Sequence, residues 1–409
     1  MICRHCEAAL DLVLVDLGSA PPSNAYLTDQ TLKAPEKWFP LRVLVCRECW
    51  LVQTEDFAQA HELFDADYAY FSGFSTGWLA HSERYVGAMT ERFALGSDSH
   101  VVEIAANDGY LLQYVQARGI PCTGVEPTRG PAAAARQKGI AIVEEFFGVR
   151  LARELVSQGK YADLTAANNV LAHVPDINDF VAGFAILLKP QGVATFEFPH
   201  IQKLIAQTQF DTIYHEHFSY LSLSAVDRIF LANGLKVFDV EEHPTHGGSL
   251  RVFAQRLDTG HHPRSPKVDE VLQNEIEAGI TTSEYYSGFQ ARTNQVKNDL
   301  LAFLLDAKRK GQSVAAYGAA AKGNTILNYA GVRSDLLPFV TDRSPAKQGK
   351  YTPGGRIPIC GEAQLRDAKP DFVLILPWNL KQEVMLQLDY IKAWGGRFVT
   401  AVPQLEIAP

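Results

Sequence analysis

The strongest constraint on the fold is an alternation of short apolar runs and helical segments between residues 101 and 198. Strands that alternate with helices form a parallel, doubly wound α/β sheet, and ligands of such sheets bind at the carboxyl ends of the strands. The expected strands are 101–105, 122–125, 140–143, 164–167 and 193–198, and the expected helices are 110–118, 132–138 and 176–188.

The loop after the first expected strand indicates the kind of cofactor. Its sequence, AANDG at residues 105–109, holds a single glycine, whereas a dinucleotide pyrophosphate needs the three glycines of G-x-G-x-x-G. Glu126, at the end of the second strand, is where a carboxylate can bind both hydroxyls of a ribose. S-adenosylmethionine has a ribose but no phosphate, so the pattern favours it over NAD, with Asn168 and Asn169 near its amino acid or adenine. A doubly wound domain that binds another ligand, or none, is the alternative.

Four of the six cysteines form two C-x2-C pairs near the N-terminus, Cys3 with Cys6 and Cys46 with Cys49. Two such turns can place four thiolates tetrahedrally around Zn²⁺, and four cysteine ligands leave no open position for water. We therefore predict a structural zinc site that stabilises a segment with a small core. The other two cysteines, Cys122 and Cys360, are expected to be buried small hydrophobic residues.

Length and composition limit the remaining possibilities. The chain has 409 residues, of which 47% are hydrophobic, and a net charge of −8, which does not favour non-specific binding to nucleic acid. No uncharged apolar run reaches the ~18 residues of a membrane span, and the first residues lack the apolar region of a signal peptide. We expect a soluble, cytoplasmic protein with domains at 1–66, 67–282 and 283–409.

The C-terminal third predicts a second, small α/β sheet. Helices are expected at 267–280 and 283–310, followed by a strand–loop–helix unit over 313–325 and by strands at 337–340, 372–376 and 398–401. The loop of the 313–325 unit could bind a phosphate through its backbone amides, with Lys322 and Asn324 as candidate contacts to a diphosphate. Asp342, at the end of the next strand, is placed like a ribose-binding acid, so an NAD site was weighed, but the three-glycine fingerprint is missing.

Three motifs carry a resemblance to a known family. Residues 103–110 (EIAANDGY) resemble the first motif of class I S-adenosylmethionine-dependent methyltransferases, and residues 189–192 (KPQG) resemble their loop before the fifth strand. With the four cysteines and residues 214–218 (YHEHF), nearly the whole chain is similar to the sugar C-methyltransferases, which act on nucleotide-linked 4-keto-6-deoxy sugars in branched deoxysugar biosynthesis.

The resemblance implies a class I methyltransferase sheet flanked by an N-terminal zinc domain and a C-terminal Rossmann-like α/β domain. Loop pattern and resemblance together predict these cofactor-binding residues: Glu103, Ala105, Asn107, Gly109, Tyr110, Glu126, Pro127, Asn168 and Asn169.

The block at 214–218 suggests the reaction. Adding a carbon to a sugar needs an enolate beside a ketone, and therefore a base of near-neutral pKa, which histidine supplies. The residues alone do not choose between His215 and His217. In an extended segment these two histidines would face away from Glu216, so His217 and Glu216 share a pocket only if a turn or helix intervenes.

The resemblance implies roles for four of these side chains. It places the general base at His217, with Tyr214, Glu216 and His173 around the reacting sugar. Tyr68, in an aromatic segment after the cysteines, could cover the sulfonium or the sugar, and a packing role is an equal alternative.

The sequence leaves two other kinds of activity as alternatives. An O- or N-methyltransferase would need no enolising base, and an NAD-dependent nucleotide-sugar oxidoreductase or epimerase would use the C-terminal sheet. The nucleotide (thymidine or guanosine diphosphate), the methylated carbon (C3 preferred over C5) and the oligomeric state stay open. The hairpin expected around residues 243–255 was given no chemical role.

Overall fold

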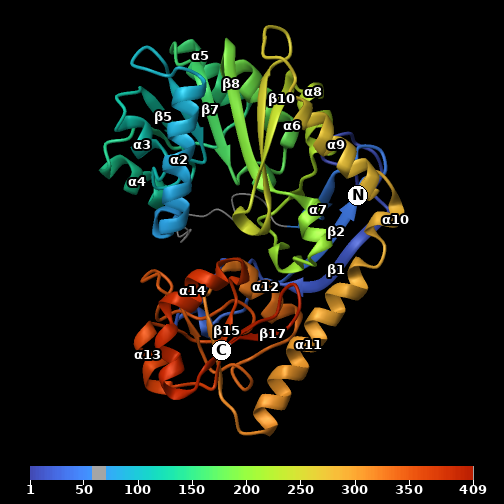
Figure 1. Ribbon diagram of the computed structural model, residues 1–409, viewed down its shortest axis with the longest axis vertical. Coiled ribbons are helices and arrows are strands. Elements are labelled where there is room, and N and C mark those ends of the chain that lie inside the picture. The colour runs from blue at the N-terminus through green and yellow to red at the C-terminus, as the bar shows by residue number, and fades with distance from the viewer. Residues whose placement is uncertain (58–70, 409) are drawn as a thin grey trace.

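The computed structural model describes residues 1–57 and 71–408, arranged in two α/β halves joined along one side by the N-terminal strands and a long helix (Figure 1). None of the helices in these residues is both long and apolar enough to cross a bilayer. Tyr68, the candidate substrate contact after the cysteines, lies outside the described residues.

The upper half is built on a sheet of seven strands in the order β10-β11-β8-β7-β4-β5-β6. All neighbours in it are parallel except β11, which is antiparallel to β10 and β8. This is the doubly wound sheet predicted from the sequence. Its strands are β4 (Val101–Ile104), β5 (Cys122–Val125), β6 (Ile142–Val143), β7 (Ala162–Asn168), β8 (Leu188–Pro199), β10 (Leu235–His243) and β11 (Ser249–Arg256).

Helices cover both faces of this sheet. On one face α5, α6 and α8 pack into a core in which the ring of Phe196 lies 4.7 Å from those of both Phe184 and Phe230. On the other face α2 and α3 pack around Tyr85 and Leu111. The helices are α2 (Thr76–Arg92), α3 (Leu112–Gln116), α4 (Arg129–Gln137), α5 (Val149–Ser157), α6 (Ile177–Leu187) and α8 (Leu223–Ala232). The sequence prediction missed α2, whose buried face includes His81 and Ser82, and also α5 and α8.

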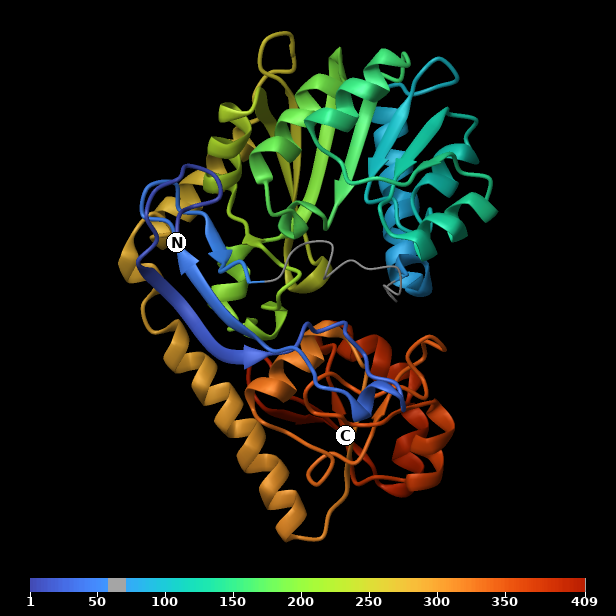
Figure 2. The same cartoon turned by 180° about the vertical axis from the view of Figure 1, so that it is seen from behind.

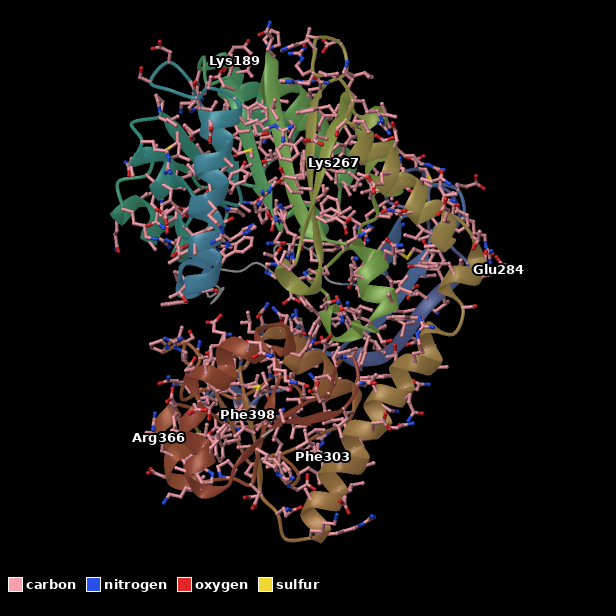
Figure 3. The ribbon with its side chains drawn as sticks, in the orientation of Figure 1. Lys189, Lys267, Glu284, Phe303, Arg366 and Phe398 are labelled. Atoms are coloured by element: carbon pink, nitrogen blue, oxygen red, sulfur yellow. The ribbon has the colours of Figure 1, made fainter. Side chains whose placement is uncertain are left out.

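The hairpin expected around residues 243–255 is confirmed as β10 and β11. The β8 strand begins five residues before its predicted start at Val193, because residues 188–192 continue its extended backbone. Lys189, in this added part, lies at the edge of the sheet remote from the C-terminal half (Figure 3).

The N-terminal residues connect the two halves (Figure 2). Strands β1 (Leu12–Ala20), β2 (Phe39–Val45) and β3 (Val52–Thr54) form an antiparallel sheet whose fourth strand, β9 (Ser219–Tyr220), comes from the middle of the chain. The cysteine turns pack into the core of the upper half, whereas β1 and β2 pack against helix α11 and the lower sheet. The domain boundaries predicted at 66 and 282 stay predictions.

The lower half holds six described strands in the order β14-β13-β12-β15-β16-β17, parallel except for the last pair. Its strands are β12 (Val314–Tyr317), β13 (Val340–Thr341), β14 (Ile359–Cys360), β15 (Phe372–Ile375), β16 (Arg397–Thr400) and β17 (Glu406–Ala408). Its helices are α12 (Ala321–Tyr329), α13 (Glu362–Ala368) and α14 (Lys381–Gln387). The predicted Rossmann-like sheet is therefore present.

Three helices lead from the upper half to the lower one: α9 (Pro266–Ala278), α10 (Ser283–Tyr286) and α11 (Phe289–Arg309). The single helix predicted over 283–310 was wrong. Gly288 has φ = 76°, a left-handed conformation that ends α10 and begins α11. The apolar face predicted for α11 is correct, since Phe289, Val296 and Leu300 are buried.

Candidate active site

The four N-terminal cysteines form one cluster. The Sγ atoms of Cys3 and Cys49 are 3.5 Å apart, as are those of Cys6 and Cys46, and all four sulfur atoms lie within 4.8 Å of one another. Four thiolates at ~2.3 Å from a tetrahedral Zn²⁺ would be about 3.8 Å apart, so the cluster fits zinc. The predicted set of ligands is brought together.

Both cysteine turns have the same backbone. The residue after each pair has a left-handed conformation, with φ = 63° at Glu7 and 62° at Trp50. The first cysteine N–H of each pair donates to the carbonyl five residues later, at 2.8 Å in the first turn and 3.0 Å in the second. Repetition of one turn explains how two distant segments present equivalent pairs of ligands. Cys122 and Cys360 are half-buried, not fully buried as expected.

The loop after β4 is turned by left-handed residues. Ala105, Asn107 and Gly109 have φ = 59°, 48° and 74°. A Cβ on Gly109 would lie 2.3 Å from Cδ1 of Ile140, so this glycine is required by both conformation and space. The segment at 72–74 covers the loop, because the Ser72 N–H donates to Oδ1 of Asn107 at 2.9 Å. Sequence reasoning had missed this cover.

Glu126 ties the loop to the next strand. Its Oε2 accepts the N–H of Asn107 at 2.9 Å, and its Oε1 accepts the N–H of Thr128 at 2.8 Å and the Thr128 hydroxyl, across Pro127. Burial raises the pKa of Glu126, and these hydrogen bonds oppose the rise. The carboxylate is thereby fixed at the carboxyl edge of the sheet, where a ribose would lie.

Other predicted cofactor residues gather at the same edge. Burial raises the pKa of Glu103 and of Tyr110 well above their usual ranges. The Oδ1 atoms of Asn168 and Asn169 are buried and have no hydrogen-bond partner among the described residues. Because an unpaired buried amide oxygen is costly, these two fit a site that a polar ligand such as S-adenosylmethionine completes.

The block at 214–218 is a turn, not the extended segment that alternation would give. The N–H of His217 donates to the carbonyl of Tyr214 at 2.9 Å, so residues 214–217 fold back on themselves. The turn separates the two histidines. His215 contacts the N-terminal segment, with Nε2 at 3.3 Å from the Phe39 carbonyl, whereas His217 joins the predicted group.

The His217 ring lies among other aromatic rings. Its centroid is 3.9 Å from that of Tyr214 and 4.6 Å from that of His173. Its Nδ1 lies 2.7 Å from the carbonyl oxygen of Thr212. A carbonyl only accepts, so Nδ1 carries the proton and Nε2 of the neutral ring is the basic nitrogen. The turn therefore places His217, and not His215, beside Tyr214 and His173, and its role as the base stays a prediction.

The electrostatics keep these imidazoles neutral. Burial lowers the pKa of His217 well below its usual value, and the neighbouring His173 adds to this effect. Burial also lowers the pKa of His173 to about 4. His217 is thus neutral at physiological pH and can accept a proton, and its lowered pKa makes it a weaker base than the near-neutral one expected from the sequence.

Glu216 lies on the other side of the turn. Its Oε1 accepts from Nδ2 of Asn24 at 3.1 Å, and its Oε2 is buried without a partner in the described part of the chain. Burial raises the pKa of Glu216. The carboxyl group therefore has one oxygen available to a substrate hydroxyl.

The lower half contributes Lys322, from the first turn of α12. Its Nζ donates to Oδ1 of Asn379 at 2.7 Å, and its positive charge lowers the pKa of His217 and of His246. Asn324, the second predicted diphosphate contact, is buried, and its Nδ2 already donates to the Ser23 carbonyl at 2.7 Å.

Sequence reasoning gave no role to the loop between β10 and β11, yet His246 of this loop joins the site. It has φ = 55°, and its ring lies edge-on to Trp78 at 5.2 Å. Burial lowers its pKa to about 4. The loop is held by the Thr245 hydroxyl, which donates to Glu197 at 3.0 Å. The only sequence signal was the adjacent pair of glycines, which marks a turn but no chemistry.

Three family models match the chain in order. A zinc-binding domain matches residues 3–64, a methyltransferase domain residues 78–240, and a C-methyltransferase C-terminal domain residues 244–403. The C-terminal match begins in the loop between β10 and β11, so it includes β11 of the upper sheet as well as the lower half.

Individual proteins are similar to the chain as well. The C-methyltransferase NovU of Streptomyces niveus is 34% identical over 402 residues, which cover 98% of this chain and 95% of NovU. Among solved structures, magnesium protoporphyrin IX methyltransferase from Synechocystis PCC 6803 aligns with 44% of this chain and 84% of its own, with a TM-score of 0.36 and 15% identity. The PH0226 protein from Pyrococcus horikoshii OT3 aligns with 49% of this chain and all of its own, with a TM-score of 0.39 and 13% identity.

The match to NovU along almost the whole length of both proteins joins the three domains into one family assignment. This match favours a C-methyltransferase over the O- or N-methyltransferase and the NAD-dependent enzyme that the sequence had left as alternatives. The chain belongs to the family of S-adenosylmethionine-dependent C-methyltransferases with an N-terminal zinc-binding domain.

Proposed function

We propose that this C-methyltransferase acts on a nucleotide-linked 4-keto-6-deoxy sugar and transfers the methyl group to C3. The observation that carries the proposal is the state of His217. Its Nδ1–H is held by the Thr212 carbonyl, so the lone pair of Nε2 is the free basic position in a ring cluster with Tyr214 and His173. Methylation of carbon requires such a base, because a C–H proton must leave before the new bond forms.

The steps follow from these residues. Nε2 of His217 takes the C3 proton, and the electrons of the C–H bond move into an enolate with negative charge on the C4 oxygen. A donor beside that oxygen stabilises it, and we assign this role to His173, with Tyr214 orienting the sugar. The enolate electrons would then form the C3–CH3 bond as the S–CH3 bond of the sulfonium breaks, so that the ketone returns, S-adenosylhomocysteine leaves and the proton stays on Nε2 of His217. S-adenosylmethionine, when bound, supplies the electrophilic methyl group.

The substrate contacts are proposals of the same kind. Oε2 of Glu216 would accept a sugar hydroxyl, and the ammonium of Lys322 would lie near the diphosphate of a thymidine or guanosine nucleotide. Asn324 would act through the Ser23 backbone that it holds, since its amide nitrogen is already engaged. The role suggested for Tyr68 stays a prediction.

Proton exchange tests the proposal. With a 4-keto sugar nucleotide and S-adenosylhomocysteine in D2O, the wild-type protein should exchange the C3 proton, as followed by NMR. His217→Ala should slow this exchange and methylation by roughly 10²–10⁴-fold. The matched control is His215→Gln, in the same turn but against the N-terminal segment, and it should retain exchange. Normal exchange and methylation in His217→Ala would place the base elsewhere. A product methylated at C5 would correct the position.

A further inference from the structure

Trp378 of the lower half reaches three parts of the active site. It begins the short helix η6 (Trp378–Leu380), which two residues separate from the end of β15. Its Nε1–H donates to Oδ2 of Asp211 at 2.7 Å, and Nζ of Lys322 lies 5.1 Å from its ring centroid. A Cβ on Gly247 would lie 2.7 Å from its Cη2, so the His246 loop packs closely on the same ring.

Asp211 is the upper-half partner of this tryptophan. It is buried in η4 (Phe210–Thr212), next to Thr212, whose carbonyl holds His217. Burial raises the pKa of Asp211 to about 6, and the positive charge of Lys322 opposes this rise. Its Oδ1 is buried and has no partner among the described residues. The side chain of Asp211 therefore connects η4, whose Thr212 carbonyl holds His217, with Trp378 of the lower half.

Lys322 is held by neutral groups. Its Nζ donates to Asn379, the residue after Trp378, and faces the indole ring. Within residues 1–57 and 71–408 no carboxylate oxygen lies within 4 Å of this nitrogen. The ammonium is therefore oriented without being neutralised by direct contact, as suits a lysine that receives an anion.

We propose that Trp378 is a positioning residue that holds Lys322 toward the diphosphate of the substrate, and that its hydrogen bond to Asp211 fixes the indole ring in place for this role. This inference rests on the proposed function, because that function supplies the anion. It assigns the lower half a direct part in aligning the substrate with the base, with Trp378 acting through Lys322.

A double-mutant cycle on the full-length protein tests the inference. The variants are Lys322→Met, Trp378→Leu and their combination, and the readouts are kcat and KM for the 4-keto sugar nucleotide and the Kd of S-adenosylhomocysteine. Trp378→Leu should raise KM roughly 10- to 100-fold, the worth of one contact to a charged group, with kcat and the cofactor Kd little changed. The double variant should be no worse than Lys322→Met alone, because the tryptophan acts through the lysine.

Two further variants separate positioning from folding. Trp394→Phe is the matched control, since Trp394 also donates one indole hydrogen bond, to the Pro370 carbonyl at 3.0 Å, but lies away from Lys322. It should leave KM unchanged. Trp378→Phe keeps the ring under Lys322 and loses only the bond to Asp211, so its KM should lie between those of wild type and Trp378→Leu.

The outcomes distinguish the inference from the function on which it rests. Fully additive losses in the double variant, or an equal rise in KM for Trp394→Phe, would overturn the positioning role while leaving the sugar methyltransferase intact. A wild-type protein that methylates none of the thymidine- or guanosine-linked 4-keto sugars would overturn the proposed function, and the role of Trp378 with it.

Discussion

In both α/β halves a carboxylate at the end of one strand accepts an N–H from the loop after the neighbouring strand, but the two loops have different surroundings. In the upper half, Glu126 at the end of β5 accepts the N–H of Asn107 from the loop after β4, at 2.9 Å. In the lower half, Asp342 directly follows β13 and accepts the N–H of Ala319 from the loop after β12, at 2.7 Å. In both, a carboxylate on the neighbouring strand fixes the loop that precedes a helix.

The surroundings of the two loops differ. The Ala319 carbonyl is covered by the Tyr26 hydroxyl at 2.5 Å and by Nζ of Lys347 at 2.8 Å. A Cβ on Gly318 would lie 2.5 Å from the ring of Pro377. Protein groups thus occupy the lower loop where a dinucleotide would bind. The comparison teaches that a carboxylate at the end of a strand first stabilises the fold, so that it is not by itself evidence of a nucleoside site.

Chelation of zinc should give the largest difference between the halves. The cysteine turns pack into the core of the upper half, whereas β12 and β15 belong to another core. Removing the metal should remove about 10 kcal/mol of binding free energy and unfold the cysteine turns first. Hydrogen exchange with and without a strong chelator measures this by segment. Residues 3–10 and 46–51 and the packed face of α8 should lose protection before residues 314–376. Equal loss in both halves would mean that they unfold as one unit.

Glu126→Ala and Asp342→Ala compare the two carboxylates directly. Glu126→Ala should weaken binding of S-adenosylhomocysteine by roughly 100-fold, because a hydrogen bond to a charged group is worth about 1.5–3 kcal/mol. Asp342→Ala should lower stability by a similar free energy without changing that affinity. Isothermal titration calorimetry and thermal melting measure the two effects. Weaker cofactor binding in Asp342→Ala would show that the lower loop belongs to the same site.

Much of this comparison was predictable from local pattern. The spacing of the two C-x2-C pairs predicted the cysteine cluster. The spacing between the loop after β4 and the end of β5 predicted the position of Glu126. The turn at 214–217 was not predictable from alternation, because it depends on the hydrogen bond between His217 and Tyr214. Trp378 and His246 were missed for another reason: they meet Lys322 and Trp78 only after distant parts of the chain fold together.

Acid should act on the upper half alone. Burial lowers the pKa of both His173 and His246 to about 4, below the ~6.5 of an unfolded histidine. Between these values the unfolded state binds protons that the folded state excludes, so stability is lost as pH falls from 6.5 toward 4, by up to about 1.4 kcal/mol per pH unit for each histidine and about 2.7 kcal/mol per pH unit for the pair.

The sequence offers a built-in control for this acid effect, since residues 283–409 contain no histidine. Hydrogen exchange at pH 7 and pH 5, corrected for the intrinsic rate, should show lost protection around residues 171–174 and 245–247, with little change in β12 and β15. The variant His173→Gln should reduce the pH dependence. Equal acid sensitivity in the lower sheet would trace the effect to carboxylates instead.

The smallest change in stability should come from removing the Tyr26 hydroxyl, which covers the loop after β12. Tyr26→Phe removes the hydroxyl that donates to the Ala319 carbonyl, but Lys347 still donates to that oxygen, so the cost should be about 1 kcal/mol or less and the fall in Tm about 2 °C. Tyr351→Phe is the matched control, because its hydroxyl bonds an exposed carboxylate, Asp29, and should cost less. Removing one hydroxyl leaves Lys347 and Pro377 in place, so Tyr26→Phe should gain no affinity for NADH in a thermal-shift titration. Stabilisation of this variant by NADH would mean that a single hydroxyl, and not the packing of the whole loop, keeps the lower half from binding a dinucleotide.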